Sequence, residues 1–222
     1  MEFSPTNLVG KSLRKLGEEL LRRNGMEGTW IDVGAHNGEE TLGYARHNPG
    51  LRIYAIEPNL KAAGRLMGRA PNYHVIPFAI SETDGSAEFQ LNEFEMASSL
   101  LSLNEEAART WTGVGSHKVC SKVIVPTVRL DTLMGLLGIQ RVDYLKIDTQ
   151  GMDLAVVRST GDRISDIAKI RLEVVVAPTP LYHGAPTKGE VVRFLTEAGF
   201  TLMREESQTY GQEQNLTFAR NQ

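Results

Sequence analysis

The chain has 222 residues, a length typical of one domain, and its 24 Lys and Arg against 27 Asp and Glu give a net charge of −3. This balance excludes a nucleic-acid or anionic-membrane binder driven by charge, and the single cysteine, Cys120, excludes an internal disulfide and a cysteine-based zinc site. No run approaches about 18 apolar residues, and the first residues lack the charged-then-apolar pattern of a signal peptide, which predicts a cytoplasmic protein without a membrane segment.

Segments typical of helices and strands alternate along the chain. Apolar residues at helical spacing predict a first helix over residues 9–20, which Asn24 and Gly25 would end. The following pattern predicts helices over 39–47, 60–68, 130–137, 153–158 and 187–199, and strands over 29–33, 52–56, 73–80, 87–91, 119–125, 143–147, 170–176, 200–204 and 215–220. This alternation favours an α/β fold with a mostly parallel sheet covered by helices on both faces.

Three local signals refine this prediction. The turn at Asp84 and Gly85 favours a hairpin in which the strand over 87–91 pairs back on the preceding strand, and the last two strands form a second hairpin. Thr187 and Glu190 form a capping box. The polar stretch over 92–117 is expected to be a mobile loop or lid, whose Trp111 closes over a substrate or anchors the loop, and Cys120 is expected in the core.

The turn after the first strand carries two glycines with the spacing G-x-x-x-G. Gly34 lets the backbone turn sharply off the strand, and Gly38 lets the next helix pack close to it. A nicotinamide or flavin fingerprint needs a further glycine between them, and His36 stands at that position. The turn therefore favours a nucleoside ligand without a pyrophosphate. Asp32 is placed to accept hydrogen bonds from a ligand ammonium, and His36 to touch the ligand.

Glu57 ends the second strand. An acid at this position binds the ribose hydroxyls in dinucleotide folds. Taken separately, the glycines are explained by a tight strand–helix connection and Glu57 by a solvated strand end. Their occurrence on consecutive strands favours a nucleoside site.

Several segments resemble a known family. IDVGAHNGEET, YAIEPN and PFAISETDG resemble the S-adenosylmethionine site of Rossmann-like methyltransferases. VPTVRLDTL and VDYLKIDTQGMDLAVVR resemble the FkbM branch, whose members carry similar L-D-x-L and K-x-D-x-E-G motifs. The resemblance covers roughly residues 29–200, and Gln150 stands where that family usually has an acid.

The resemblance implies a Rossmann-like class I methyltransferase with a mostly parallel seven-stranded sheet flanked by helices. Residues 1–28 would form an N-terminal helical extension, residues 29–222 the single domain, and about 84–126 an inserted hairpin and loop region. The implied cofactor is S-adenosylmethionine. Its expected contacts come from the motifs and from a small-residue segment: Asp32, Gly34, Ala35, His36, Asn37, Gly38, Thr41, Glu57, Pro58, Ala79, Ile80, Ser98, Ser99 and Asp148.

Lys146 and Asp148 lie two residues apart on a strand and therefore on one face of it. A lysine inside an apolar strand is costly unless it is paired. One interpretation is a structural ion pair of Lys146 with Asp148 or Asp32. The other, which we favour, places Lys146 and Asp148 beside the cofactor methyl, where they orient and deprotonate an acceptor hydroxyl.

Two further residues are candidate catalytic groups. Glu173, in the next strand, would join the same cluster, and His183, in the loop after it, is a candidate general base because an ordinary imidazole titrates near neutrality. Together with Asp148 these side chains offer ligands for Mg²⁺, a less favoured alternative because no compact ligand motif is present. We expect no metal.

The implied function is methyl transfer to a hydroxyl of a small molecule, such as a natural product or a sugar-like acceptor, without a nucleic-acid or membrane partner. A nicotinamide-dependent dehydrogenase is disfavoured by His36, and Gln150 is the one hint of a non-catalytic cofactor-binding subunit. Nucleobase methylation is disfavoured because the residues after Asp148 lack the two prolines and the aromatic residue that stack a flipped base. The oligomeric state stays open, with a homodimer among the options.

Overall fold

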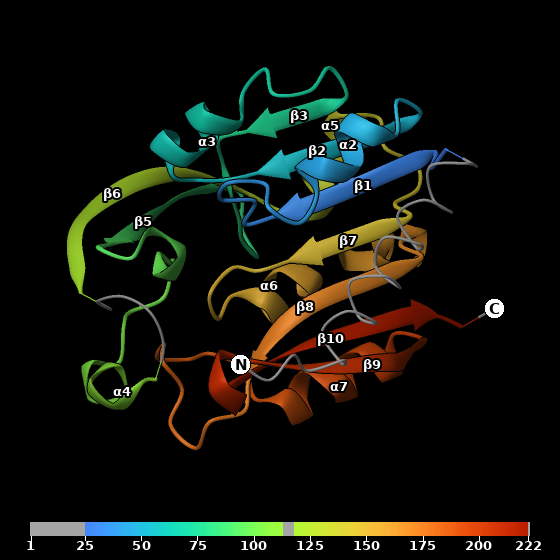
Figure 1. Cartoon of the computed structure of the whole chain (residues 1–222). Helices are drawn as coiled ribbons and strands as arrows, with labels where there is room; N and C mark the ends of the chain where they lie inside the picture. The colour runs from blue at the N-terminus through green and yellow to red at the C-terminus, as the bar shows by residue number, and fades with distance from the viewer. Residues whose placement is uncertain (1–24, 113–117, 222) are drawn as a thin grey trace, which may run out of the picture.

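The computed structural model describes residues 25–112 and 118–221, and the first predicted helix, over 9–20, lies outside them. Helices and strands alternate along the chain, as predicted (Figure 1). The division into an N-terminal extension and one domain therefore stays a prediction.

Seven strands form the main sheet, in the order β3-β2-β1-β7-β8-β10-β9. The four pairings among β3, β2, β1, β7 and β8 are parallel, and β10 runs antiparallel to both of its neighbours. This arrangement confirms the predicted fold class. The strands are β1 (Gly28–Val33), β2 (Leu51–Ile56), β3 (Tyr73–Ile76), β7 (Tyr144–Ile147), β8 (Lys169–Val175), β9 (Phe200–Gln208) and β10 (Glu213–Arg220).

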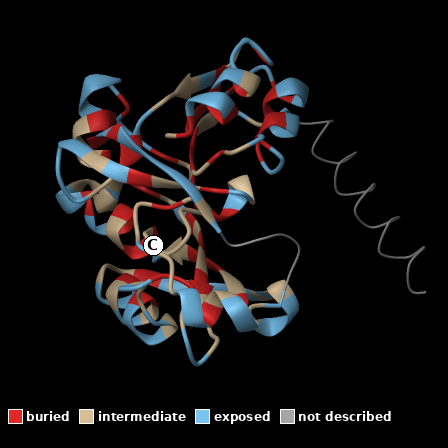
Figure 2. Cartoon of the chain, turned by 90° about the vertical axis from the view of Figure 1, so that its left-hand side faces the viewer, coloured by how far each residue is buried: buried red, intermediate tan, exposed pale blue. Residues whose placement is uncertain are grey.

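Helices cover both faces of this sheet because the side chains of its central strands alternate between two apolar clusters. On β1, Ile31 and Val33 belong to the larger cluster, and Trp30 belongs to the smaller one. The larger cluster packs against α5 (Leu130–Leu136), α6 (Asp153–Arg158) and α7 (Lys188–Glu197), and the smaller one against α2 (Leu42–His47) and α3 (Leu60–Leu66). Buried residues accordingly lie along the strands, and exposed ones on the outer sides of the helices (Figure 2).

A second sheet of three strands lies beyond the carboxyl ends of the parallel strands (Figure 1). It contains β4 (Ala79–Ile80), β6 (Val119–Val128) and β5 (Gly85–Asn92), in that order. The prediction of a single strand over 73–80 is therefore wrong. It divides at Pro77, which has no amide hydrogen for the ladder, so that β3 and β4 join different sheets.

The partner predicted for the strand over 87–91 is wrong. β5 pairs antiparallel with β6, which is long enough to match it along its whole length, and not with β3. The Asp84 carboxylate accepts hydrogen bonds from Arg129 N (2.7 Å) and Thr132 Oγ1 (3.0 Å), which ties the turn to the end of β6.

Two other sequence expectations need correction. The described part of the stretch predicted as a loop, residues 92–112, is less irregular than predicted, because it contains the 3-10 helix η1 (Glu95–Ala97) and α4 (Glu105–Thr110), whose first turn is capped by the Asn104 side chain. Cys120 is exposed, not in the core, because residues 120–124 of β6 are all exposed, so both faces of the strand are open to solvent there, and the Cys120 thiol points to Leu91 O at 3.3 Å. The chain also contains the short 3-10 helices η2 (Gly161–Asp166) and η3 (Thr209–Gly211).

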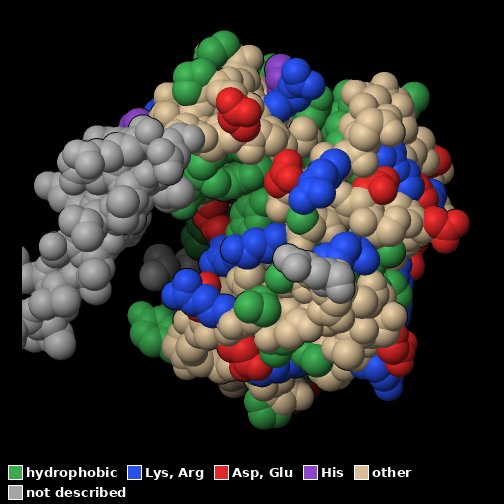
Figure 3. Space-filling view, turned by 90° about the vertical axis from the view of Figure 1, so that its right-hand side faces the viewer, with side chains coloured by type: hydrophobic (Ala, Val, Ile, Leu, Met, Phe, Trp, Pro, Cys, Tyr) green, Lys and Arg blue, Asp and Glu red, His purple; other side chains and the backbone are tan. Residues whose placement is uncertain are grey.

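The capping box at Thr187 and Glu190 is present at the start of α7, with both reciprocal hydrogen bonds. Among the described residues, no helix combines the length and apolar character needed to cross a bilayer. On the face at the amino ends of the parallel strands, acidic and basic side chains are interspersed (Figure 3).

Candidate functional site

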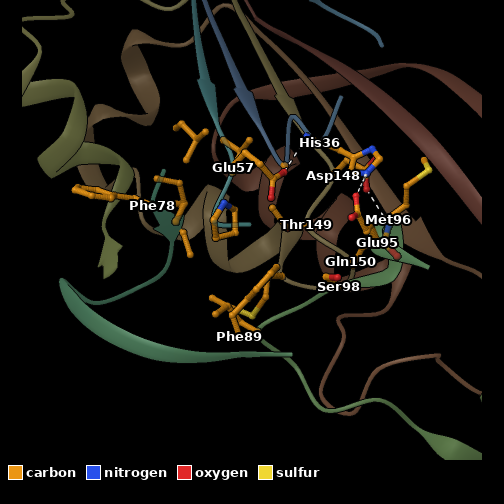
Figure 4. Close-up of a pocket in the computed structure, with 18 residues that line it drawn as sticks. His36, Glu57, Phe78, Phe89, Glu95, Met96, Ser98, Asp148, Thr149 and Gln150 are labelled. Atoms are coloured by element: carbon orange, nitrogen blue, oxygen red, sulfur yellow. Dashed lines mark hydrogen bonds and ion pairs between the residues drawn. The ribbon is translucent and has the colours of Figure 1, made fainter. Parts of the chain in front are cut away.

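The main cavity opens where the parallel strands β1, β2 and β7 end and the small sheet begins. It has a volume of about 680 Å³, counting its open mouth. Its walls come from the glycine turn after β1, the end of β2, the connection from β3 to β4, β5, the η1 segment and the loop from β7 to α6. Phe78 and Phe89 lie on one side of the cavity, and Glu95, Asp148 and Gln150 lie on the other (Figure 4).

The glycine turn brings two strand ends into direct contact. Gly34 has φ +76°, and a Cβ atom at this position would lie 1.8 Å from Asp148 O. Any side chain there would therefore push the turn after β1 away from the loop after β7. Gly38, with φ +69°, packs against Leu42 and Leu66, as predicted for close helix packing.

Glu57 holds this turn in place and lines the cavity. Its carboxylate accepts hydrogen bonds from His36 N and Asn59 N, both at 2.8 Å, and only 5% of the residue is exposed. Burial raises the pKa of Glu57, while the two backbone N–H groups oppose this change. Glu57 is thus fixed by the backbone and is not a solvated strand end.

Lys146 and Asp32 form a buried ion pair across β7 and β1. Lys146 Nζ lies 3.1 Å from Asp32 Oδ1 and 3.8 Å from Asp148 Oδ2, and it donates a hydrogen bond to Gly34 O at 3.0 Å. Thr41 Oγ1 donates to the other oxygen of Asp32 at 2.5 Å. Burial acts to lower the pKa of Lys146, but the carboxylates of Asp32 and Asp148 outweigh it and raise this pKa.

These contacts fit the structural interpretation of Lys146. Lys146 is 4% exposed and Asp32 is 1% exposed, and neither lines the cavity. Asp32 is therefore already paired, and a ligand ammonium in the cavity would not reach it. Asp148, by contrast, lines the cavity.

Glu95 joins η1 to the glycine turn and to α3. Its carboxylate lies 2.6 Å from Arg65 Nη2, 3.2 Å from Lys61 Nζ and 3.6 Å from His36 Nε2. The hydrogen bond from Arg65 is the main cause that lowers the pKa of Glu95 to about 2. His36 Nε2 is a buried atom without a hydrogen-bond partner at the wall of the cavity, and so a ligand atom can bind it there.

A group of carboxyl side chains lies beside Asp148. Asp153, at the start of α6, is 1% exposed and accepts hydrogen bonds from Thr149 Oγ1 (3.0 Å) and Glu173 N (3.2 Å). Burial, helped by the charge of Asp148, raises the pKa of Asp153 to about 7. Glu173 is joined to Asp148 through Gln150, so the structure brings these two predicted residues together.

The residues predicted to contact the cofactor fall into two groups. Those that line the cavity are Gly34, His36, Glu57, Pro58, Ala79, Ile80, Ser98 and Asp148. Those that lie nearby without lining it are Asp32, Ala35, Asn37, Gly38, Thr41 and Ser99. Of the second group, Ser99 is buried and donates a hydrogen bond to Gln150 O at 2.8 Å.

His183 is not brought to the cavity. It is exposed, in the loop before α7, and its backbone N–H donates to Ser102 O at 2.9 Å. Trp111 is half-buried at the end of α4 and does not line the cavity. Across residues 25–112 and 118–221, no three His, Cys, Asp or Glu side chains are grouped as a metal ion would require.

Sequence reasoning missed several cavity residues, which are Phe78, Phe89, Glu95, Met96, Leu100, Thr149 and Met152. Phe78, Thr149 and Met152 lie inside the segments that resemble the family, and this signal could have identified them. The others come from β5, η1 and the segment after it, and only the folded chain brings them to the cavity.

Comparison with known proteins identifies relatives of this chain. Residues 32–202 match the family described as the methyltransferase FkbM domain. The chain is 22% identical over 165 residues to the 2-O-methyltransferase NoeI of Sinorhizobium fredii, a match that covers 69% of this chain and 65% of NoeI. The chain therefore spans less than two thirds of the length of this curated relative.

A solved structure shows the same fold at low identity. A magnesium protoporphyrin IX methyltransferase from Synechocystis PCC 6803 with bound SAH is 11% identical, with 100% of this chain and 90% of that chain covered and a TM-score of 0.50. A precorrin-6y C5,15-methyltransferase from Geobacter metallireducens is 14% identical, with 90% and 84% covered and a TM-score of 0.47.

Replacing Lys146 by Met should destabilise the fold. The change leaves the buried Asp32 carboxylate without its cation, which typically costs about 3–5 kcal/mol. Urea denaturation followed by circular dichroism measures the free energy of unfolding. In the exposed pair of Lys122 with Glu88 (2.8 Å), Lys122→Met is the matched control and should cost less than about 1 kcal/mol. Equal losses in the two variants would contradict a stabilising buried pair.

Replacing Asp153 by Asn should change how stability depends on pH. The pKa of Asp153 rises from an ordinary 3.8 to about 7 on folding, so its stabilising effect is full below pH 4 and is lost as the pH rises to about 7. The Asn oxygen still accepts from Glu173 N, while the Asn nitrogen donates to Thr149 Oγ1 instead of accepting from it, so the variant lacks this pH-dependent loss. The melting temperature of the variant relative to the wild type should increase between pH 4.5 and 7.5, by about 2–4 °C per kcal/mol relieved.

The exposed Asp162→Asn is the control for this measurement, because its carboxyl group lies in solvent. Its melting curve should follow the wild type across the same pH range. A pH-independent effect of Asp153→Asn would contradict the raised pKa.

Proposed function

This chain belongs to the FkbM methyltransferase family, whose sequence pattern spans residues 32–202, and we propose that it methylates a hydroxyl group of a small molecule. The methyl donor is S-adenosylmethionine, and the proposed acceptors are natural products and sugars. Family membership concerns methyl transfer in general, and the hydroxyl as the methylated group is the more specific part that we propose.

The observation that carries the proposal is the placement of Glu57 and the glycine turn at one end of a cavity with apolar walls. The Glu57 carboxylate is held by two backbone N–H groups and keeps lone pairs for the hydroxyls of a ribose. Phe78, Ala79 and Ile80 offer an apolar surface beside it, suited to a nucleobase. These residues fit the nucleoside part of S-adenosylmethionine.

The charges of the cavity argue against a dinucleotide. Its titratable side chains are Glu57, Glu95, Asp148 and His36, and the described residues that line it include no Lys or Arg. A pyrophosphate would meet three carboxyl groups there, at a turn where His36 replaces the glycine of the nicotinamide fingerprint. A neutral acceptor and a cationic sulfonium cofactor suit these charges.

Methyl transfer to oxygen requires alignment and the removal of a proton. The bound cofactor supplies an electrophilic methyl group. Asp148 lines the cavity at the carboxyl end of β7, where its carboxylate is placed to accept the proton of an acceptor hydroxyl and to orient its oxygen. Positioning of this kind carries much of the catalysis of a displacement reaction.

The relative in Sinorhizobium fredii supports oxygen as the methylated atom, because that protein is a 2-O-methyltransferase. The second candidate is a non-catalytic subunit that keeps the nucleoside site. It is favoured by one feature, Gln150, which stands where the family usually carries an acid. Transfer of label from S-adenosylmethionine to an acceptor separates the two candidates.

Calorimetry tests the cofactor site directly. The wild-type protein should bind S-adenosylmethionine and S-adenosylhomocysteine but not NAD. Glu57→Ala should weaken binding by about ten- to a hundredfold, because a charge-assisted hydrogen bond to ribose is worth roughly 1.5–3 kcal/mol. Tight NAD binding without a response to S-adenosylmethionine would contradict the assignment.

Glu57→Ala also removes the acceptor for His36 N and Asn59 N, so the melting temperature must be measured on the same preparation. Glu39→Ala is the matched control, because Glu39 directly follows the glycine turn, is exposed and does not line the cavity. Unchanged affinity in a stable Glu57→Ala variant would remove Glu57 from the site.

Asp148→Asn tests the proposed chemistry. The change keeps the size of the side chain but removes the carboxylate, so turnover should fall by about 10²- to 10⁴-fold while cofactor affinity changes less. Label transfer to a panel of glycosides and phenols identifies an acceptor, and single-turnover rates then compare the variant with the wild type. A stable variant with near-normal turnover would exclude Asp148 as the base.

A further inference from the structure

Gln150 lies at the centre of the polar groups beside the cavity. We propose that Gln150 is a positioning residue, whose neutral amide bridges Asp148 and Glu173 and so holds the Asp148 carboxylate at the cavity without adding a third carboxyl group. This proposal rests on the proposed role of Asp148 in methyl transfer. It assigns a role to the side chain at which this chain departs from its family.

The hydrogen bonds of Gln150 are those of an amide. Nε2 donates to Asp148 Oδ1 at 2.9 Å and to Glu173 Oε2 at 3.2 Å. Oε1 accepts a hydrogen bond from the Tyr182 hydroxyl at 3.2 Å. Two donors thus meet two carboxyl groups, and one acceptor meets a hydroxyl. A carboxylate at this position would place its oxygens against those of Asp148 and Glu173 unless a proton were shared.

The backbone of Gln150 is held in place as well as its side chain. Gln150 has φ +55°, a left-handed conformation that non-glycine residues seldom adopt. Its carbonyl accepts the Ser99 hydroxyl at 2.8 Å. The single hydrogen of the Tyr182 hydroxyl is shared between Ala97 O, at 2.7 Å, and Gln150 Oε1. Gln150 is therefore attached both to the segment after η1 and to the loop before α7.

The surroundings are strongly acidic. Burial raises the pKa of Glu173 well above its ordinary value, and the charges of Asp148, Glu213 and Asp153 raise it further. Lys146 supplies the nearby positive charge. The charged and titratable groups around Asp148, from all the elements packed near it and from the cavity wall, are Asp32, His36, Glu57, Glu95, Lys146, Asp153, Glu173, Tyr182 and Glu213. An uncharged Gln150 limits the repulsion among them.

Exchanging the amide and the acid tests this role. The variants are Gln150→Glu, Glu173→Gln and the double variant that carries both changes. Gln150→Glu adds a carboxyl group, whereas the double variant restores one amide and one acid in contact. The exposed Gln140→Glu adds the same charge at the surface and is the matched control.

The first measurement is the melting temperature of the unliganded proteins between pH 5.5 and 8. Carboxyl groups whose pKa is raised on folding lose their stabilising effect as the pH rises, so Gln150→Glu should lose stability with increasing pH. Relative to the wild type, its melting temperature should fall by about 3–5 °C across this range, the equivalent of one pKa unit. The double variant should recover most of this loss, and Gln140→Glu should show none.

The second measurement is the pH profile of label transfer from S-adenosylmethionine, with an acceptor found for the wild type. In Gln150→Glu the acidic limb should move up by about one pH unit, which is a roughly tenfold loss of rate at a given pH on that limb, and it should return in the double variant. A purely structural contact would lower the rate without moving this limb.

Each result decides one part of the proposal. A Gln150→Glu variant with the wild-type pH dependence of melting, or a double variant without recovery, would overturn the neutral bridge. If Gln150→Glu changes the pH dependence of melting but not the pH profile of the rate, then Gln150 does not position Asp148 for catalysis. A wild-type protein that transfers no methyl group would contradict the proposed function, while the melting series would still decide the bridge.

Discussion

The architecture of the site depends on one cation buried in the middle of the main sheet. Lys146 connects the carboxylate of Asp32 on β1, the carbonyl of Gly34 in the glycine turn and the carboxylate of Asp148 at the end of β7. Because an unpaired ammonium is costly in such a place, these three groups must stay close to it. The contacts of Lys146 that join β7 to β1 therefore also fix the position of the glycine turn relative to Asp148, which lines the cavity.

The small sheet and η1 complete the cavity that the main sheet begins. Phe89 of β5 supplies an apolar wall, and Glu95 of η1 forms ion pairs with Lys61 and Arg65 of α3. These pairs are partly exposed, and such contacts are weaker than the buried pair of Lys146 with Asp32. The inserted segment is thus attached to a rigid centre by weaker interactions, which suits a wall that must admit a ligand.

The sequence predicts the elements and motifs whose information is local. The order of strands and helices, the sharp turn at Gly34 and the capping box of Thr187 each follow from neighbouring residues, and the structure contains them. The sequence does not decide between Asp32 and Asp148 as the partner of Lys146, because the order of the strands in the sheet decides it. The sequence does not predict the exposure of Cys120, since a β-branched strand has the same sequence pattern whether or not its sheet is covered there.

Four acidic side chains at this end of the sheet are held by four kinds of partner. Backbone N–H groups hold Glu57, an ammonium holds Asp32, a guanidinium holds Glu95, and an amide holds Asp148. Groups that are already oriented need not reorganise when a ligand binds or charge moves, which is the general advantage of a preorganised polar site. Because Lys146 and Arg65 are occupied by carboxylates and do not line the cavity, a ligand meets oriented acceptors there. Such a surface recognises hydroxyl groups and cations better than phosphates.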